Sequence, residues 1–258
     1  MGGNSTDDVF SRRRTSFGAI AAEYDAVRPS WPEETVRWML GSPDPATELA
    51  VVDLGAGTGK GSRVLARMGN RVTAVEPAEG MLGALRGSLL GLEPEVAARV
   101  EPRDGSAEHV PVEDGSADAV TVFQAWHWFD HEAASQECAR VLRPGGWLSM
   151  AWHRRDESVA WQEELSALVD RHESIADDQD FPAFPEAFEP VEHEVFGWTM
   201  QQSPEDLARH AGTWSFVAIR PDRDAVLERV HDLGRRVAGA DGMVELPMLT
   251  ECYRLRHR

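Results

Sequence analysis

The sequence predicts an α/β fold, in which a parallel sheet carries helices on both faces. Two observations support this class. Between residues 49 and 152, short apolar segments alternate with longer amphipathic ones, which is the pattern of strands joined by crossover helices. The first apolar segment runs into a glycine-rich turn at residues 55–61, and a helical pattern follows it. In folds of this class the crossovers are right-handed, and ligands bind at the carboxyl ends of the strands.

Two helices are expected before the sheet. Residues 17–27 carry apolar side chains at helical spacing. The segment Ser30-Trp31-Pro32-Glu33 matches a capping box with an early proline, and it predicts a second helix as far as Leu40. Residues 41–48 are polar and contain two prolines, so they predict a linker.

Strands and helices then follow in alternation. Apolar and β-branched runs predict the strands, and spacing of three to four between apolar residues predicts the helices. The turn Arg143-Pro144-Gly145-Gly146 should lead into the last strand of the series. In chain order we expect strand 49–54, helix 63–68, strand 71–75, helix 81–90, strand 98–103, strand 119–124, helix 131–141 and strand 147–152.

The last hundred residues have a different pattern. A segment rich in acids, proline and phenylalanine, residues 173–190, predicts a mobile lid. Ser203-Pro204-Glu205-Asp206 predicts a helix start. The other elements expected here are helix 161–172, strand 192–200, helix 222–237 and a final strand 248–256. The chain thus divides into an N-terminal tail with helices (1–45), a core of alternating strands and helices (46–153), and a C-terminal region that holds the last two strands (154–258).

Composition excludes several classes of partner. The formal net charge of −18 disfavours sequence-independent nucleic-acid binding and anionic membrane surfaces, because both rely on Lys and Arg. No apolar run is long enough to span a bilayer, and residues 1–8 lack the apolar region of a secretory signal. Two cysteines far apart in sequence make neither a disulfide framework nor a zinc site. We therefore expect a cytoplasmic protein without a metal, a nucleic-acid partner or a membrane partner.

The glycine turn is the strongest ligand signal. A phosphate-binding loop of the P-loop type needs a glycine where Leu54 stands and Ser or Thr where Gly61 stands, so that interpretation fails. A dinucleotide loop needs a third glycine where Lys60 stands, so the nicotinamide interpretation is disfavoured. Glu76 closes the next strand, 21 residues after Gly55, at the spacing of a carboxylate that accepts from ribose hydroxyls. The alternative is a glycine turn that binds nothing.

Four blocks stand in a fixed order within residues 45–153: VVDLGAGTGKGS, TAVEP with Met81, DGSAEHVPVEDGSADAVTVFQAWHWF, and ECARVLRPGGWLSM. Together they resemble the class I S-adenosylmethionine-dependent methyltransferases. The block QAWHWF at residues 124–129 and the N-terminal motif from Tyr24-Asp25 to Arg28-Pro29-Ser30-Trp31-Pro32 are more narrowly similar to the trans-aconitate methyltransferase-like branch. That branch contains small-molecule and carboxylate methyltransferases.

The resemblance implies a Rossmann-like seven-stranded sheet, mostly parallel with an antiparallel last strand, with helices on both faces, N-terminal helices and a C-terminal lid region. It implies S-adenosyl-L-methionine as the cofactor. It also implies that helices within 1–45 cover the cofactor, that residues 46–153 form the cofactor-binding Rossmann-like core, and that the helices and lid within 154–258 cover the substrate. The family usually has Asp at the position of Ser106, and here the Ser106 hydroxyl and the Ala107 N–H would replace it at the adenine. Carried over onto this chain, the cofactor-binding residues are Tyr24, Asp53, Gly55, Ala56, Gly57, Gly59, Glu76, Pro77, Met81, Ser106, Ala107, Gln124 and Ala125.

Methyl transfer from a sulfonium requires positioning in a dry pocket, and it needs neither a metal nor a covalent nucleophile. A carboxylate acceptor is already ionised at pH 7 and needs a cation to hold it. A hydroxyl or amine acceptor gains from a base. The candidate cations are Arg28, Arg154, Arg155 and Arg220, and the candidate bases are His127 and His153.

Trp126 and Trp128 flank His127 after a predicted core strand, where α/β folds bind ligands. We expect His127 and Arg28 to be catalytic, and Trp126, Trp128 and His153 to bind the substrate. Structural roles for His127 and His153 are the alternative. The preferred interpretation is O-methylation of a small-molecule carboxylate or hydroxyl by a monomer or homodimer. The rivals are N- or C-methylation of a natural-product scaffold, and a non-catalytic cofactor-binding module.

Overall fold

The computed structural model describes residues 27–41, 44–169 and 184–258. The predicted helix over residues 17–27, apart from Val27, and the part of the predicted lid before residue 184 lie outside the described residues. The strands are β1 Ala50–Leu54, β2 Arg71–Val75, β3 Val100–Arg103, β4 Ala117–Phe123, β5 Leu142–Arg155, β6 Glu192–Gln202 and β7 Val244–Arg256. The helices are α3 Glu33–Met39, α4 Lys60–Arg67, α5 Glu79–Leu89, α6 Pro94–Ala97, α7 His131–Val141, α8 Ala160–Leu168, α9 Pro204–Gly212, α10 Ser215–Ala218 and α11 Arg223–Val237, with a 3₁₀ turn, η2, at Trp126–Trp128.

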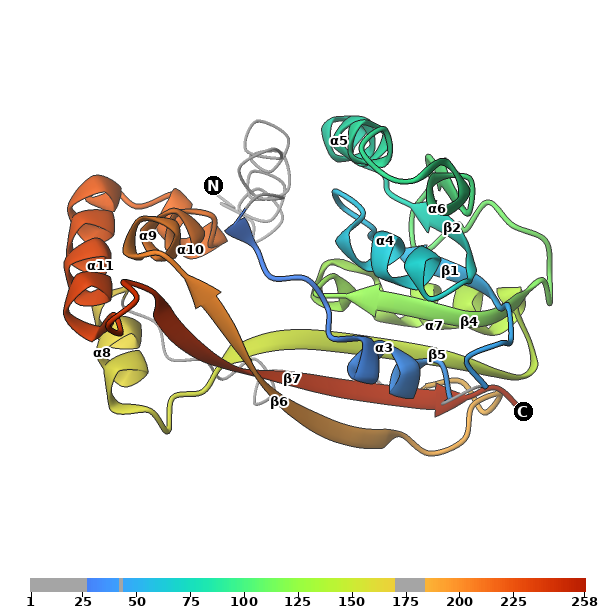
Figure 1. Cartoon of the computed structure of the whole chain (residues 1–258). Coiled ribbons are helices and arrows are strands. Elements are labelled where there is room, and N and C mark those ends of the chain that lie inside the picture. The colour runs from blue at the N-terminus through green and yellow to red at the C-terminus, as the bar shows by residue number, and fades with distance from the viewer. Residues whose placement is uncertain (1–26, 42–43, 170–183) are drawn as a thin grey trace, which may run out of the picture.

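All of these strands join one sheet in the order β3-β2-β1-β4-β5-β7-β6 (Figure 1). Strands β1 to β5 are parallel, and β7 runs antiparallel to its two neighbours, β5 and β6. The order reverses between β1 and β4, and this switch point opens a crevice at the carboxyl ends of those strands. The predicted Rossmann-like sheet with an antiparallel last strand is confirmed.

Two apolar cores cover the two faces of the sheet, because successive strand residues point to opposite sides. On one face, α3 and α4 bury Val36 and Leu65 against Val51 of β1. On the other face, α7 buries Cys138 against Val52, the next residue of β1.

Strands β5, β6 and β7 extend beyond the parallel part of the sheet, and α8 to α11 gather at their far end (Figure 1). These helices have a core of their own, in which Leu207 of α9 and Val230 of α11 pack with Leu246 of β7. We call α8 to α11 with the ends of β6 and β7 the helical lobe. The Ser203 hydroxyl accepts a hydrogen bond from the Asp206 N–H at the start of α9, which confirms the predicted cap.

Three expectations about elements are corrected. Ser30 does not cap α3, because the helix begins later and its N-cap is Pro32, which makes no side-chain hydrogen bond. The residue before a proline favours extended backbone, so Trp31 stays outside the helix. The predicted turn at residues 143–146 is part of β5, with a register irregularity opposite it in β4. The four-residue helices α6 and α10 were not predicted, because one turn leaves no periodicity to detect.

Candidate functional site

The glycine loop between β1 and α4 needs glycine for two different reasons. Gly55, Gly57 and Gly59 all have positive φ angles, of 65°, 58° and 84°, which other residues adopt at a cost. At Gly55 a Cβ would also lie 2.7 Å from the Cβ of Ala125, because the loop after β4 crosses closely here. At Gly57 a Cβ would meet nothing within 4 Å. Gly57 therefore borders open space that a ligand can enter.

Glu76 joins the ends of β1 and β2 through its carboxylate. One oxygen accepts from the Gly57 N–H at 2.9 Å, and the other accepts from the Ala78 N–H at 2.9 Å. Glu76 is 8% exposed, so its charge lies in a partly dry site beside the open space at Gly57. A carboxylate with this placement fits the ribose hydroxyls of S-adenosylmethionine, because each oxygen can accept further hydrogen bonds.

Asp53, the other acid of the loop, is turned away from that space. Its carboxylate accepts from the Ser62 hydroxyl at 2.6 Å and from the Thr121 hydroxyl at 3.3 Å, and it is 1% exposed. Burial raises the pKa of Asp53 to about 7, against the lowering effect of the Ser62 and Thr121 hydrogen bonds. Asp53 joins β1 to α4 and β4, and so it holds the glycine loop from inside the core.

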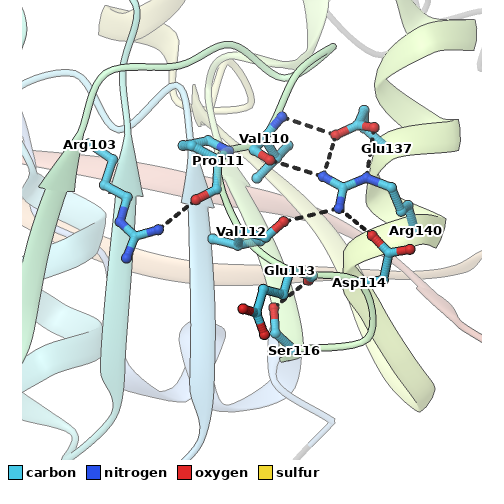
Figure 2. A network of polar contacts seen from close by, with 9 residues as sticks. All are labelled: Arg103, Val110, Pro111, Val112, Glu113, Asp114, Ser116, Glu137 and Arg140. Atoms are coloured by element: carbon cyan, nitrogen blue, oxygen red, sulfur yellow. Dashed lines mark hydrogen bonds and ion pairs between the residues drawn. The ribbon is translucent and has the colours of Figure 1, made fainter.

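Residues 104–114 follow the carboxyl end of β3 and carry two of the predicted cofactor contacts, Ser106 and Ala107. Ser106 pairs with His109 through backbone hydrogen bonds of 3.4 and 3.2 Å, and Ala107 is buried at 3% exposure. Figure 2 shows how Arg140 of α7 holds this segment. Its guanidinium donates to the carbonyls of Val110 and Val112, while its partner Glu137 accepts from the Val110 N–H. Ser106 and Ala107 therefore lie on a loop fixed by side chains from α7.

The cofactor-side residues after β2 differ in exposure. Pro77 is exposed, whereas Met81 of α5 is buried at 6% exposure. Pro77 follows Glu76 directly at the carboxyl edge of β2, and Met81 lies in the first turn of α5. Their positions are consistent with the predicted contacts to an adenine ring.

The backbone changes direction sharply after β4. Gln124 has a φ of 55°, which is the positive-φ conformation that non-glycine residues rarely adopt. Its side chain donates to the His153 carbonyl at 3.3 Å, and its N–H donates to the Ala151 carbonyl at 2.8 Å. These bonds tie the end of β4 to β5 and direct Ala125 over Gly55.

A cavity of about 70 Å³ lies beside the glycine loop. Within the described ranges its wall contains two cationic residues, Arg28 and Lys60, and no residue with a carboxylate. The lining residues are Arg28, Pro29, Trp31, Gly55, Ala56, Gly57, Thr58, Lys60, Gly61, Phe123, Gln124 and His153. Lys60 is the only lysine of the chain.

Arg28 joins the segment before α3 to the helical lobe. Its Nε donates to the Thr213 hydroxyl at 2.9 Å, and one terminal nitrogen donates to the Thr213 carbonyl at 3.0 Å. The cavity wall at Arg28 therefore continues into α9 of the helical lobe. Tyr24, the other residue predicted from this N-terminal motif, lies outside the described residues.

Three further candidate cations each lie beside an acid. Arg154 pairs with Glu251 at 2.8 Å, Arg155 lies 3.7 Å from Glu157, and Arg220 pairs with Asp222 at 2.8 Å. None of these three arginines is among the residues that line the cavity.

The block Trp126-His127-Trp128 forms the turn η2, so its side chains do not alternate as in a strand. Trp126 is 1% exposed and packs in the core against the His131 ring. His127 is exposed, and its Nδ1 accepts a hydrogen bond of 3.5 Å from the Trp152 indole. Trp128 is half-buried beside His127. None of the three lines the cavity.

His153 does line the cavity, and it is 7% exposed. Burial lowers the pKa of His153 to about 3, which the Ser30 carbonyl opposes and the Arg28 charge reinforces. The ring is therefore neutral at physiological pH. It stacks on Trp31, with ring centroids 3.8 Å apart.

Sequence reasoning missed Trp31 and Lys60 as cavity residues. Trp31 was assigned to a helix start, although it stands in the motif that carries the family resemblance. Lys60 directly follows Gly59 of the glycine loop, and this place beside the loop is the sequence signal that could have identified it. Among the described residues, no group of three or more His, Cys, Asp or Glu side chains is arranged to hold a metal ion. No helix within the described ranges is long and apolar enough to cross a membrane.

Comparison with known proteins agrees with this geometry. Residues 52–150 match the model of a methyltransferase domain. An uncharacterized methyltransferase of Mycobacterium tuberculosis is 38% identical over 244 residues, covering 93% of this chain and 94% of the relative. An uncharacterized methyltransferase of Schizosaccharomyces pombe is 31% identical, covering 84% of each chain.

A solved structure shares the fold. It is a putative type II methyltransferase of Anaeromyxobacter dehalogenans, with a TM-score of 0.66 at 24% identity, covering 89% of this chain and 97% of that one. The glycine loop, the carboxylate of Glu76 beside it and the strand order thus coincide with a domain match and with full-length relatives. The chain belongs to the methyltransferase family, as a class I enzyme that uses S-adenosylmethionine.

Proposed function

We propose that the protein transfers a methyl group to a carboxylate oxygen of a small organic acid. The observation that carries this proposal is the charge of the cavity wall. In a chain of net charge −18, the described residues that line the cavity include two cations, Arg28 and Lys60, and no acid. S-adenosylmethionine brings one carboxylate of its own, so one cation suits the cofactor and the second suits an anionic acceptor.

The histidines support a carboxylate over a hydroxyl. A hydroxyl acceptor gains from a base whose pKa lies near the working pH. His153, on the cavity wall, is a very weak base because burial lowers its pKa to about 3. His127 is exposed, and its Nδ1 already accepts from Trp152. A carboxylate needs neither residue as a base.

The proposal gives each part of the site a role. When bound, S-adenosylmethionine supplies an electrophilic methyl group on a sulfonium. The glycine loop and Glu76 hold the cofactor, Ser106 and Ala107 border its adenine, and Gln124 and Ala125 line its methionine end. Arg28 and His153 orient the acceptor, and the helical lobe covers it. His127 and Trp128 lie at the rim of the crevice, and Trp126 supports them from the core.

A methyl-transfer assay with a panel of acids and phenols tests the proposal. Labelled S-adenosylmethionine and purified enzyme are incubated with each compound, and the products are treated with alkali. A methyl ester releases labelled methanol under these conditions, whereas a methyl ether or methylamine does not. We expect alkali-labile label from one or more acids. Label that is stable to alkali on the best substrate would overturn the proposal while leaving the enzyme class intact.

Replacing Arg28 separates the two acceptor types. With a carboxylate substrate, Arg28→Met removes a charged hydrogen-bond donor, and we expect KM to rise about tenfold or more. His127→Asn should leave the pH profile of kcat unchanged. A steep pH profile that depends on His127, with Arg28→Met nearly silent, would instead support a hydroxyl acceptor.

A further inference from the structure

Three neighbouring strands place one polar side chain each beneath the cavity. His153 of β5 stands opposite Thr250 of β7 in the antiparallel register. The His153 Nδ1 lies 2.9 Å from the Thr250 Oγ1, and the indole Nε1 of Trp198, on β6, lies 2.8 Å from the same oxygen. Thr250 is fully buried. A chain of hydrogen bonds therefore runs from Trp198 through Thr250 to the imidazole.

These two hydrogen bonds can be formed together in only one direction of donation, from Trp198 to Thr250 and from Thr250 to His153. An indole N–H can only donate, so the Thr250 oxygen accepts from Trp198. The hydroxyl hydrogen of Thr250 then needs an acceptor, and among the described residues its remaining partner is the His153 Nδ1. A neutral imidazole that accepts at Nδ1 carries its hydrogen on Nε2. The geometry thus selects the Nε2–H tautomer.

The ring is also held in place. Trp31 stacks on it at an interplanar angle of 17°, and the Trp198 ring lies 5.0 Å away by centroid distance. The Nε2 atom is buried and makes no hydrogen bond of ordinary geometry within the described part of the chain; the Ser30 carbonyl is close enough to act as a weak acceptor, which raises the pKa of His153 against the effect of burial. A buried donor that is only weakly satisfied gains from a stronger acceptor, which a carboxylate ligand can supply.

We propose that His153 is a fixed hydrogen-bond donor to the carboxylate of the methyl acceptor, and that Thr250 and Trp198 are positioning residues that set this state. The proposal rests on the proposed function for the identity of the acceptor. It assigns His153 to acceptor selection and not to proton transfer.

The reaction that follows balances without a base. One carboxylate oxygen forms a bond to the methyl carbon as the sulfur–carbon bond breaks, and the electron pair of that bond stays on sulfur. The sulfonium becomes a neutral thioether, the carboxylate becomes a neutral ester, and no proton moves. The second carboxylate oxygen accepts from the His153 Nε2–H. A neutral amine must use its one lone pair to attack the methyl group, so it would present only N–H groups to this N–H, and the site discriminates against amines.

The tautomer can be measured without a substrate. Two-bond proton–nitrogen correlation spectra of protein labelled with ¹⁵N-histidine distinguish the two neutral tautomers, and His153→Asn identifies the His153 signal. We expect the Nε2–H form from pH 6 to 8. Thr250→Val should move the Nδ1 resonance to that of a nitrogen without a hydrogen bond. Thr199→Val, an exposed threonine on β6, is the control and should leave the signal unchanged. A wild-type Nδ1–H tautomer, or no response to Thr250→Val, would overturn the proposal.

A second measurement identifies what the donor contacts. S-adenosylhomocysteine is added alone, and then with the carboxylate that the enzyme methylates best. We expect the Nε2–H proton of His153 to shift mainly on the second addition, and Thr250→Val to raise KM for the acid about tenfold with little change in kcat. A full shift with S-adenosylhomocysteine alone would assign the donor to the cofactor carboxylate and overturn this role. If no carboxylate is methylated, the proposed function and the role assigned to His153 both fail, whereas the tautomer is judged by the first measurement alone.

Discussion

Asp53 and Glu76, the two acids that the sequence places at the glycine loop, have different surroundings. The carboxylate of Glu76 binds backbone N–H groups beside open space, and that of Asp53 binds hydroxyl groups inside the core. Sequence spacing predicts both acids near the loop, but it cannot tell which one faces the ligand. That difference comes from Ser62 and Thr121, which reach Asp53 from α4 and β4.

Glu76→Ala is expected to reduce the affinity for S-adenosylmethionine strongly. Each charged hydrogen bond to the ribose contributes roughly 1.5–3 kcal/mol, so two lost bonds should weaken binding about a hundredfold or more. Titration calorimetry with the cofactor measures this loss, and circular dichroism checks that the fold is retained. Unchanged affinity would show that the ribose lies elsewhere.

Gly57→Ala should also prevent cofactor binding, because the new Cβ occupies the space beside Glu76. Gly242→Ala is the matched control. Both glycines have positive φ, and an added Cβ would meet no atom within 4 Å at either one, so both substitutions strain the backbone without a clash. Gly242, however, lies in the turn before β7. We expect calorimetry to detect cofactor binding by the Gly242→Ala protein alone. Equal loss in the two variants would indicate a general effect on folding.

Asp53 should make stability depend on pH. Its folded pKa of about 7 exceeds the unfolded value of 3.8, so the folded state binds the extra proton between these values. Stability is therefore lost as pH rises from about 4 to 7, by up to about 1.4 kcal/mol per pH unit. Urea unfolding of the wild type and Asp53→Asn at several pH values measures the difference. We expect the free energy of unfolding of Asp53→Asn to rise relative to that of the wild type as pH rises. A difference that does not change with pH would contradict the raised pKa of Asp53.

At the level of elements, the sequence predicts the parallel core well. Helix α7 and strand β2 have the bounds expected from the pattern, because each is a periodic segment enclosed by clear end signals. Strands β5 and β7 are longer than expected: β5 has 14 residues and β7 has 13. The added residues 153–155 of β5 pair with β7, and the added residues 244–247 of β7 pair with β6. Such pairing between distant segments leaves no local signal.

The same limit applies to the site. Spacing within one motif predicts the glycine loop and Glu76. The bonds from Arg28 to Thr213 and from His153 to Thr250 join residues 185 and 97 positions apart, so only the folded chain brings them together. Trp126 is a further case, since the 3₁₀ turn that buries it replaces the strand alternation assumed from the sequence.

The loop after β3 should depend on α7. Arg140→Met removes the bonds to the Val110 and Val112 carbonyls and leaves Glu137 without its cation. We expect weaker binding of S-adenosylmethionine, by about threefold to tenfold, because the loop that carries Ser106 loses its support. Arg236→Met is the control, since Arg236 makes one exposed ion pair with Glu164 in the helical lobe. Equal cofactor affinity in the two variants would show that the loop is held without Arg140.

At the level of the whole molecule, two buried histidines lie where the N-terminal segment meets the helical lobe. His153 stacks on Trp31, and His210 contacts Gln202, whose amide donates to the Val27 carbonyl. Burial lowers the pKa of both histidines, that of His153 to about 3. Both rings are therefore neutral in the folded protein over the range in which the unfolded chain would be protonated.

These histidines should destabilise the protein in acid. The pKa values of both histidines in the folded protein lie below the unfolded value of 6.5. The fold with both rings neutral therefore has its full stability above pH 6.5 and loses stability as pH falls below that value. Each histidine contributes up to about 1.4 kcal/mol per pH unit. Urea unfolding at pH 7, 6 and 5 in the Asp53→Asn background measures this loss without the opposing effect of Asp53. Adding both His153→Asn and His210→Gln to this background should make the free energy of unfolding depend less on pH. An unchanged pH dependence would refute the role of the two histidines.

The long strands β5, β6 and β7 also have a consequence for how such enzymes diversify. The cofactor loop stands on β1, β2 and β4, whereas the helical lobe has its own apolar core at the far ends of β5, β6 and β7. Substitutions and insertions in the lobe can therefore accumulate without disturbing the cofactor loop. A chimaera that takes residues 156–243 from a relative should keep its donor affinity and the carboxylate contacts of Arg28 and His153, and should acquire the relative's preference among acids of different size and shape, so that new substrates are reached by exchanging one part of the chain.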